Sequence, residues 1–200
     1  MTIGVILAGG LARRMGGGDK GMRLVGGQTV LARVLERLSP QVARVIINAN
    51  GDPARFAPLG LPVVADTMPG NPGPLAGVLA GLDWAAANAP EAGWIVTVPG
   101  DAPFLPRDLV RRLHEARGQA EMACASSGGR THPVIALWPL ALRDDLRRAL
   151  AAGSNKVGAF TERHGAALAE WPAEPVDPFF NVNTPEDLEA ADLLAATHAP

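Results

Sequence analysis

A glycine-rich segment follows the first apolar run of the chain and carries the residue types that bind phosphate. Residues 8–20 have the sequence AGGLARRMGGGDK, with five glycines, two arginines and one lysine. Glycine lets backbone N–H groups approach an anion closely, and Arg14 and Lys20 add positive charge. Lys20 is one of only two lysines beside sixteen arginines, and its compact ammonium suits a point contact with phosphate. The segment therefore predicts a phosphate-binding loop in preference to a turn with solvated charges.

Two nucleotide-binding motifs are matched only in part by this segment. Gly16, Gly18 and Gly21 have the spacing of the dinucleotide fingerprint, but no acidic residue follows at the required offset and no apolar helix begins there. Lys20 lies between Asp19 and Gly21, whereas a Walker A loop requires Gly-Lys-Ser/Thr. The sequence therefore disfavours a P-loop NTPase and a dinucleotide-dependent enzyme.

Two carboxylates follow short apolar runs further along the chain. Asp101 comes after Val-Thr-Val-Pro-Gly, and Asp66 comes after residues 62–65. A carboxylate that lies beside substrate phosphates is a preferred ligand of Mg²⁺. An aspartate beside proline or glycine is also typical of a turn or a helix cap. For Asp101 both interpretations stay open, and for Asp66 the residues alone favour the turn.

Amides lie close together near the end of the chain, in the segment FFNVNTP at residues 179–185. Alternation would place Asn181 and Asn183 on one face of a short strand, with Phe180 and Val182 toward the core. Two amides on one face could bind phosphate, metal-bound water or the edge of a heterocycle. An edge strand followed by a helix cap is the simpler interpretation.

Two further reactive side chains are expected to be structural. Cys124 lies within the apolar run Met-Ala-Cys-Ala, which predicts a buried, inert thiol and not a nucleophile. His132 precedes Pro133 at the start of another apolar run. A turn histidine is the favoured interpretation there, and a substrate contact is the alternative.

The hydrophobic pattern alternates short apolar runs with longer segments of helical periodicity. We expect strands at residues 2–7, 42–48, 62–65, 94–98, 122–126, 133–138 and 166–171, and helices at residues 29–38, 74–88, 106–117, 140–151, 156–164 and 185–196. This alternation predicts one α/β domain with a mostly parallel sheet. Ligands bind such sheets outside the carboxyl ends of the strands, where the glycine-rich segment, Asn48, Asp66 and Asp101 should meet.

Composition argues against several classes of protein. Eighteen basic and twenty acidic residues give a net charge of −2, which argues against a nucleic-acid or anionic-membrane surface. The chain has no tyrosine, so a base-stacking platform is disfavoured, and its one cysteine excludes an internal disulfide. Residues 1–7 are too short for a signal peptide, and prolines and glycines interrupt the uncharged stretch 67–82. We therefore expect a cytoplasmic protein without a membrane span.

Taken together, these segments resemble the molybdenum cofactor guanylyltransferases of bacteria. Residues 6–20 resemble the nucleotide-binding signature of that family, which contains L-A-G-G, then R-M-G, then lysine. The resemblance continues in order through residues 45–50, 66, 72–77, 99–103, 132–137 and 180–188, and thus spans nearly the whole chain. It implies a single Rossmann-like, three-layer nucleotidyltransferase domain over residues 1–200.

The resemblance also implies the reaction and the partners. The family transfers GMP from GTP to molybdenum-molybdopterin cofactor and releases pyrophosphate, with Mg²⁺, or Mn²⁺ in its place, as the metal. Transient contact with the apo-proteins of molybdoenzymes or their chaperones is expected. A cytidylyltransferase or a sugar-phosphate nucleotidyltransferase of the same superfamily is the nearest alternative, and a non-catalytic cofactor carrier is another.

The family's site residues carry over by position. The resemblance assigns nucleotide binding to Leu7, Ala8, Gly9, Gly10, Lys20, Asn48, Asp66 and Asp101, catalysis to Arg14, Lys20 and Asp101, metal binding to Asp101, and the cofactor substrate to Arg14, Asn181 and Asn183. Relatives that use CTP tend to have alanine at the position of Gly9. The missing methyl group leaves room for a purine, which favours GTP.

Overall fold

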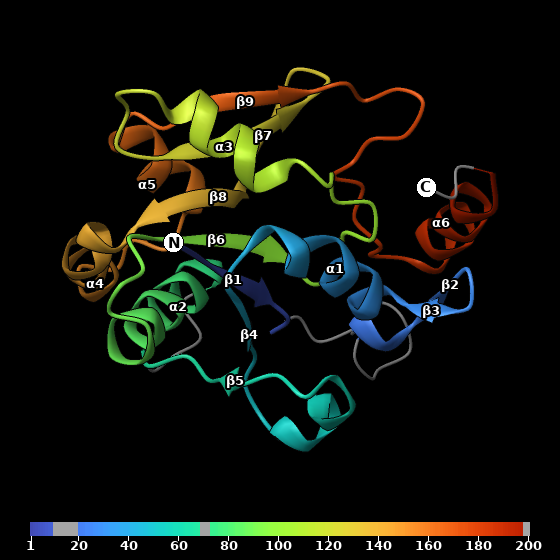
Figure 1. Ribbon diagram of the computed structural model, residues 1–200, viewed down its shortest axis with the longest axis horizontal. Coiled ribbons are helices and arrows are strands. Elements are labelled where there is room, and N and C mark those ends of the chain that lie inside the picture. Colours follow the sequence, from blue (N-terminus) through green and yellow to red (C-terminus); the bar gives the residue numbers. More distant parts are fainter. Residues whose placement is uncertain (10–19, 69–72, 198–200) are drawn as a thin grey trace.

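Seven strands form one central sheet in the structure, a computed structural model that describes residues 1–9, 20–68 and 73–197 (Figure 1). The strand order is β5-β4-β1-β6-β8-β7-β9. The strands are β1 (Thr2–Leu7), β4 (Arg44–Asn48), β5 (Val63–Val64), β6 (Trp94–Pro99), β7 (Ala123–Ser127), β8 (Arg130–Pro139) and β9 (Ala167–Trp171). Parallel pairs join β5, β4, β1 and β6, and also β7 and β9, whereas β8 runs antiparallel to both of its neighbours. The prediction of a mostly parallel sheet is confirmed.

Helices cover both faces of this sheet, because its central strands carry apolar side chains on both sides. Ile6 packs on the face that α1 (Val30–Leu38) and α3 (Leu109–Arg117) cover. Ile3 and Val5 pack on the other face, under α2 (Pro74–Asn88), α4 (Arg143–Ala151) and α5 (Val157–Arg163). The result is the three-layer α/β arrangement that the sequence predicts.

The register brings the carboxyl ends of the central strands to one edge. Leu7 at the end of β1 pairs with Asn48 of β4 and with Pro99 of β6. The backbone N–H of Ala8 donates to Asn48 (2.8 Å), and that of Gly100 donates to Leu7 (3.0 Å). The antiparallel strand β8 begins near the edge where these parallel strands end, so its first residues also reach this edge.

A small unit packs outside the three layers. The hairpin of β2 (Leu24–Val25) and β3 (Gln28–Thr29) contacts α6 (Pro185–Thr197), and both lie at one end of the molecule (Figure 1). Val182 and Ala191 belong to their shared apolar cluster. Short 3-10 helices occur at Lys20–Met22 (η2), Ser39–Gln41 (η3), Pro53–Leu59 (η4) and Leu140–Leu142 (η5). None of the helices in the described ranges is both long and apolar enough to cross a membrane.

The strand expected around Asn181 and Asn183 is wrong: residues 180–184 lie outside any strand. Their backbone donors are used elsewhere, because the N–H of Val182 donates to the carbonyl of Asp101 (2.9 Å). The N–H groups of Asn183 and Thr184 both donate to the carboxylate of Asp187 at 2.9 Å. The backbone N–H of Asp187 donates to Thr184 Oγ1 (3.2 Å), so the expected cap of the last helix is confirmed.

Candidate active site

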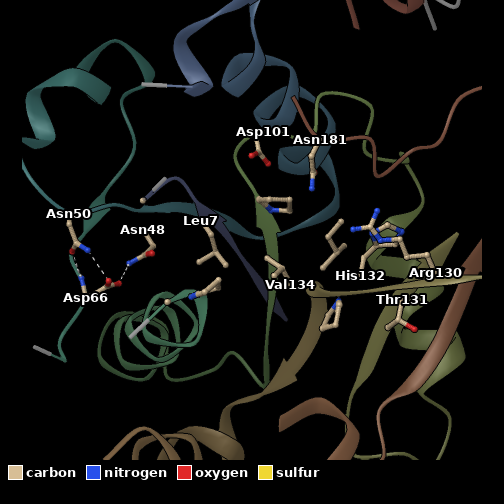
Figure 2. A pocket seen from close by; sticks show the side chains of 16 residues that line it. Leu7, Asn48, Asn50, Asp66, Asp101, Arg130, Thr131, His132, Val134 and Asn181 are labelled. Atoms are coloured by element: carbon tan, nitrogen blue, oxygen red, sulfur yellow. Dashed lines mark hydrogen bonds between the residues drawn. The ribbon is translucent and has the colours of Figure 1, made fainter. Parts of the chain in front are cut away.

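A pocket of about 460 Å³ opens at the carboxyl edge of the sheet. Its lining residues come from the ends of β1, β4 and β6, the start of α2, the start of β8 and the segment before α6. They are Leu7, Gly9, Asn48, Asn50, Asp66, Gly73, Pro74, Pro99, Asp101, Arg130, Thr131, His132, Pro133, Val134, Ile135 and Asn181. Figure 2 shows Asn48, Asn50 and Asp66 on one side, the residues of β8 on the other, and Asp101 and Asn181 between them. The pocket thus has two halves with an acidic residue where they meet.

A hydrogen-bonded cluster forms the first half. Asn48 Nδ2 donates to Asp66 Oδ1 (2.9 Å) and to the carbonyl of Val64 (3.1 Å). Asn50 Nδ2 donates to Asp66 Oδ2 (2.8 Å), and the backbone N–H of Asp66 donates to Asn50 Oδ1 (2.9 Å). Two amides therefore orient the Asp66 carboxylate, which still has lone pairs to accept from the N–H or O–H groups of a nucleoside.

Helix α2 shapes this half in two ways. Gly73 and Pro74 place its N-terminus against the pocket, where the helix dipole favours an anion. Gly77 leaves space for Asn48, because a Cβ there would overlap the Asn48 side-chain oxygen and lie 2.8 Å from Leu7 Cδ2. Close contact between helix and strand thus depends on a missing side chain.

The turn after β6 joins the two halves. Asp101 lines the pocket here, and its carbonyl accepts from Val182, which brings the neighbouring Asn181 to the same place. A Cβ built at Gly21 would lie 3.4 Å from the carbonyl oxygen of Gly100. The backbone that leaves the glycine-rich segment therefore packs against the turn that carries Asp101.

The donor set at this turn suits a hard cation such as Mg²⁺. Asp101 offers carboxylate oxygens to the pocket, and no cluster of three metal-binding side chains occurs within residues 1–9, 20–68 and 73–197. Mg²⁺ commonly binds through one or two carboxylates together with substrate phosphates and water. The residues present therefore fit a magnesium ion that arrives with a polyphosphate.

The start of β8 forms the second half of the pocket, with Arg130, Thr131, His132 and Val134. Burial is the main cause that lowers the pKa of His132, and the Arg130 charge lowers it further, against opposing effects of Asp177 and Glu170. The imidazole is therefore neutral near pH 7.

Most of the predicted site residues that the structure describes come together in this pocket. Its lining includes Leu7, Gly9, Asn48, Asp66, Asp101 and Asn181. Ala8 and Asn183 are outside the lining, since Ala8 packs against the core and the backbone of Asn183 binds Asp187. Gly10, Arg14 and the side chain of Lys20 lie outside the described residues.

Asn50 follows the apolar run 42–48 and so lies at the edge that the pattern indicates, although the resemblance assigned it no role. Most of the β8 segment was not predicted, because the pattern places at this edge only the residues that follow an apolar run, which holds for parallel strands alone. In an antiparallel strand the residues at this edge precede the run, as Arg130 and Thr131 do. A search on both sides of each run would have found them. Cys124, by contrast, is buried as predicted, and burial raises the pKa of its thiol to about 11.

Known proteins resemble this chain in sequence and in fold. The family model of the MobA-like NTP transferase domain matches residues 4–168. A molybdenum cofactor guanylyltransferase of Rhodopseudomonas palustris (strain BisB5) is 60% identical over 197 residues, which are 97% of this chain and 94% of that protein. The crystal structure of molybdopterin-guanine dinucleotide biosynthesis protein A from Archaeoglobus fulgidus matches with a TM-score of 0.75 and 24% identity, over 98% of this chain and 100% of the other.

A second solved structure shows how widely this fold is used. The 4-diphosphocytidyl-2C-methyl-D-erythritol synthase of Anaerococcus prevotii matches with a TM-score of 0.74 and 14% identity, over 98% of this chain and 96% of the other. At such identities the two structures show the fold alone.

Proposed function

Because this chain belongs to the molybdenum cofactor guanylyltransferases, within the MobA-like NTP transferase family, we propose that its pocket joins the GMP part of GTP to the molybdenum cofactor. The enzyme transfers GMP from GTP to molybdenum-molybdopterin and releases pyrophosphate. The observation that carries this function is the high identity with a guanylyltransferase over nearly the whole chain. We retain the prediction that residues 1–200 form one nucleotidyltransferase domain.

The reaction makes modest chemical demands on the protein. The attacking group is the terminal phosphate of the pterin cofactor, which is already an anion and needs no strong general base. The barrier lies in bringing two anions together and in stabilising charge on the departing pyrophosphate. Positioning and electrostatic stabilisation supply what such a reaction needs.

Asp101 is the proposed magnesium ligand, because its carboxylate lies where the two halves of the pocket meet. A Mg²⁺ ion held there, or Mn²⁺ in its place, supplies positive charge to the phosphate oxygens. Lys20 and Arg14 are proposed to neutralise further phosphate oxygens. Support for Lys20 comes from the next residue, Gly21, whose backbone packs against Gly100 beside Asp101.

The amide and carboxylate cluster is the proposed nucleoside site. Asn48 and Asn50 hold the Asp66 carboxylate as an acceptor at the side of the pocket next to α2. The N-terminus of α2 and the backbone after Leu7 lie beside it, which suits the phosphates of the same nucleotide. The other half of the pocket, formed by the start of β8 with Asn181 beside it, is the proposed site of the cofactor substrate.

Gly9 supports a purine in this site. Among residues 1–9, 20–68 and 73–197, no atom lies within 4 Å of a Cβ built at Gly9, and the φ of Gly9 lies outside the left-handed region that favours glycine. Neither the backbone conformation nor the packing of these residues therefore requires glycine here. Because Gly9 lines the pocket, a methyl group would occupy space that a ligand could use.

Transfer of labelled GMP tests the proposed function. The enzyme, α-³²P-GTP, Mg²⁺ and molybdenum cofactor are incubated without oxygen, and the label is expected in the dinucleotide product. Binding of the finished cofactor without transfer would favour a carrier protein. Thermal stabilisation by CTP with Mg²⁺, and none by GTP, would favour a cytidylyltransferase and overturn the assignment.

Delivery of the product gives a further proposal about partners. The product is oxygen-sensitive, so direct transfer to a molybdoenzyme apo-protein or its chaperone in the cytoplasm would protect it. Pull-down of such a protein by the product-loaded enzyme, and not by the empty enzyme, is the expected result.

A further inference from the structure

A chain of three hydrogen-bonded side chains lies behind the second half of the pocket. Ser127, at the end of β7, donates from Oγ to Asp177 Oδ1 at 2.8 Å. The same Oγ lies 2.8 Å from Nε2 of His132. The backbone N–H of Phe179 also donates to Asp177 Oδ1 (2.9 Å), which holds this carboxylate in place. Ser127 and His132 lie on the adjacent strands of one hairpin, and Asp177 comes from a segment 50 residues beyond Ser127. Two parts of the chain therefore converge on this hydrogen-bonded chain.

The direction of these hydrogen bonds determines which nitrogen of His132 carries the proton. A serine hydroxyl has a single proton, and an ionised carboxylate can only accept. Since Ser127 gives its proton to Asp177, its oxygen must accept from His132, which requires a proton on Nε2. In a neutral imidazole Nδ1 is then an acceptor. The serine lies between the other two groups, unlike the order of a hydrolase triad, so it is not an activated nucleophile.

The acceptor nitrogen has no partner among the residues that the structure describes. His132 lines the pocket, and none of the hydrogen bonds within residues 1–9, 20–68 and 73–197 uses its Nδ1. The ring packs on the buried Phe179 with centroids 4.9 Å apart, which limits its rotation. In Figure 2, His132 lies across the pocket from Asn48 and Asp66. His132, whose Nδ1 is a neutral acceptor, thus lines the half of the pocket opposite Asn48 and Asp66.

We propose that His132 is a specificity-determining contact for the second substrate, whose pterin ring donates an N–H to Nδ1, and that Ser127 and Asp177 position it. This inference rests on the proposed function. A neutral acceptor repels phosphate oxygens, which are acceptors too, whereas a pterin carries ring and amino N–H donors. A site built to accept a hydrogen bond discriminates against analogues that lack the donor.

Two substitutions distinguish the roles of Nδ1 and Nε2 of His132. His132→Gln keeps a donor at the place of Nε2, so the bond to Ser127 survives while the acceptor at Nδ1 is lost. His132→Asn keeps an acceptor near Nδ1 and loses the bond to Ser127. The matched control is His114→Gln, since His114 is also half-buried but binds Thr2 Oγ1 (2.9 Å) at the amino end of β1.

Steady-state kinetics with both substrates provides the first test. His132→Gln is expected to raise KM for the molybdenum cofactor about tenfold, equivalent to about 1.4 kcal/mol, the scale of one hydrogen bond. KM for GTP should stay within about twofold, as for a substitution away from the nucleotide. His132→Asn should have the smaller effect on the cofactor KM, and His114→Gln should change neither. An unchanged cofactor KM in His132→Gln, or an equal rise in both KM values, would overturn the inference.

Nuclear magnetic resonance provides a test that does not depend on turnover or on the folding of variants. In ¹⁵N-histidine-labelled wild-type enzyme, His132 should show a protonated Nε2 and an unprotonated Nδ1, and anaerobic addition of molybdenum cofactor should shift Nδ1. A protonated Nδ1 in the free neutral enzyme would refute the positioning role. Absence of GMP transfer by wild type that still binds GTP would instead refute the proposed function on which the inference rests.

Discussion

Substitution of Gly77 and of Gly81 in α2 can separate an effect on core packing from an effect on the pocket. Both are buried and lie one helical turn apart, facing the sheet. A Cβ at Gly81 would lie 2.8 Å from Val5 Cγ2 and 3.3 Å from Ile95 Cδ1, so it would crowd only the core. A Cβ at Gly77 would overlap the side chain of Asn48. Alanine at either position should therefore destabilise the fold, but only Gly77→Ala should disturb the proposed nucleotide site.

The magnitudes follow from the contacts. Overpacking costs roughly 1–3 kcal/mol, and the better helix propensity of alanine offsets about 1 kcal/mol of this. Gly77→Ala also breaks the two hydrogen bonds of Asn48, to Asp66 and to Val64, at about 1 kcal/mol each. We expect the free energy of unfolding to fall by about 1 kcal/mol in Gly81→Ala and by about 3 kcal/mol in Gly77→Ala.

Urea denaturation measures the stability of both variants, and calorimetric titration with GTP and Mg²⁺ measures the nucleotide site. GTP affinity should fall at least about tenfold in Gly77→Ala, because Asn48 no longer orients Asp66, and should change less than about twofold in Gly81→Ala. Equal losses of GTP affinity in the two variants would refute the reasoning, and so would wild-type affinity in a folded Gly77→Ala enzyme.

Three further predictions concern Gly9, Asp101 and Cys124. Gly9→Ala should leave the melting temperature unchanged or slightly raised but increase KM for GTP roughly tenfold or more. The control is Gly93→Ala, at the other end of the sheet, where a Cβ also meets no described atom within 4 Å; it should keep wild-type kinetics. A KM for GTP in Gly9→Ala equal to that of wild type would show that Gly9 does not face the nucleotide. Asp101→Asn should lower kcat by roughly 10²–10³-fold with an unchanged melting temperature, and full activity across a magnesium titration would exclude Asp101 as the metal ligand. Burial raises the pKa of Cys124 from 9.0 to about 11, so the unfolded chain loses this proton first as the pH rises. Wild type should then lose roughly 2 kcal/mol more of its free energy of unfolding than Cys124→Ala between pH 9 and 11, and parallel pH profiles would contradict this.

The predicted site residues that depended on local pattern come together in the pocket. Asn48, Asp66 and Asp101 each follow an apolar run, and parallel strands in register bring the ends of such runs together. Asn181 reached the same pocket for a reason that the alternation argument did not contain. Its neighbour Val182 donates to Asp101 and is buried, so a loop contact and not a strand positions the amide.

The sequence by itself determined the order of strands and helices along the chain, the α/β class with a mostly parallel sheet, and the strand ends that line the pocket. These follow from hydrophobic periodicity, which each segment carries locally. Only the tertiary structure decided that β8 runs antiparallel, so that Arg130 and His132 reach the site from the start of a strand. The tertiary structure also brings Asp177 to Ser127, fifty residues away, so that Ser127 donates to Asp177 and accepts from His132. Such contacts depend on which distant segments pack together, and that is a property of the assembled core.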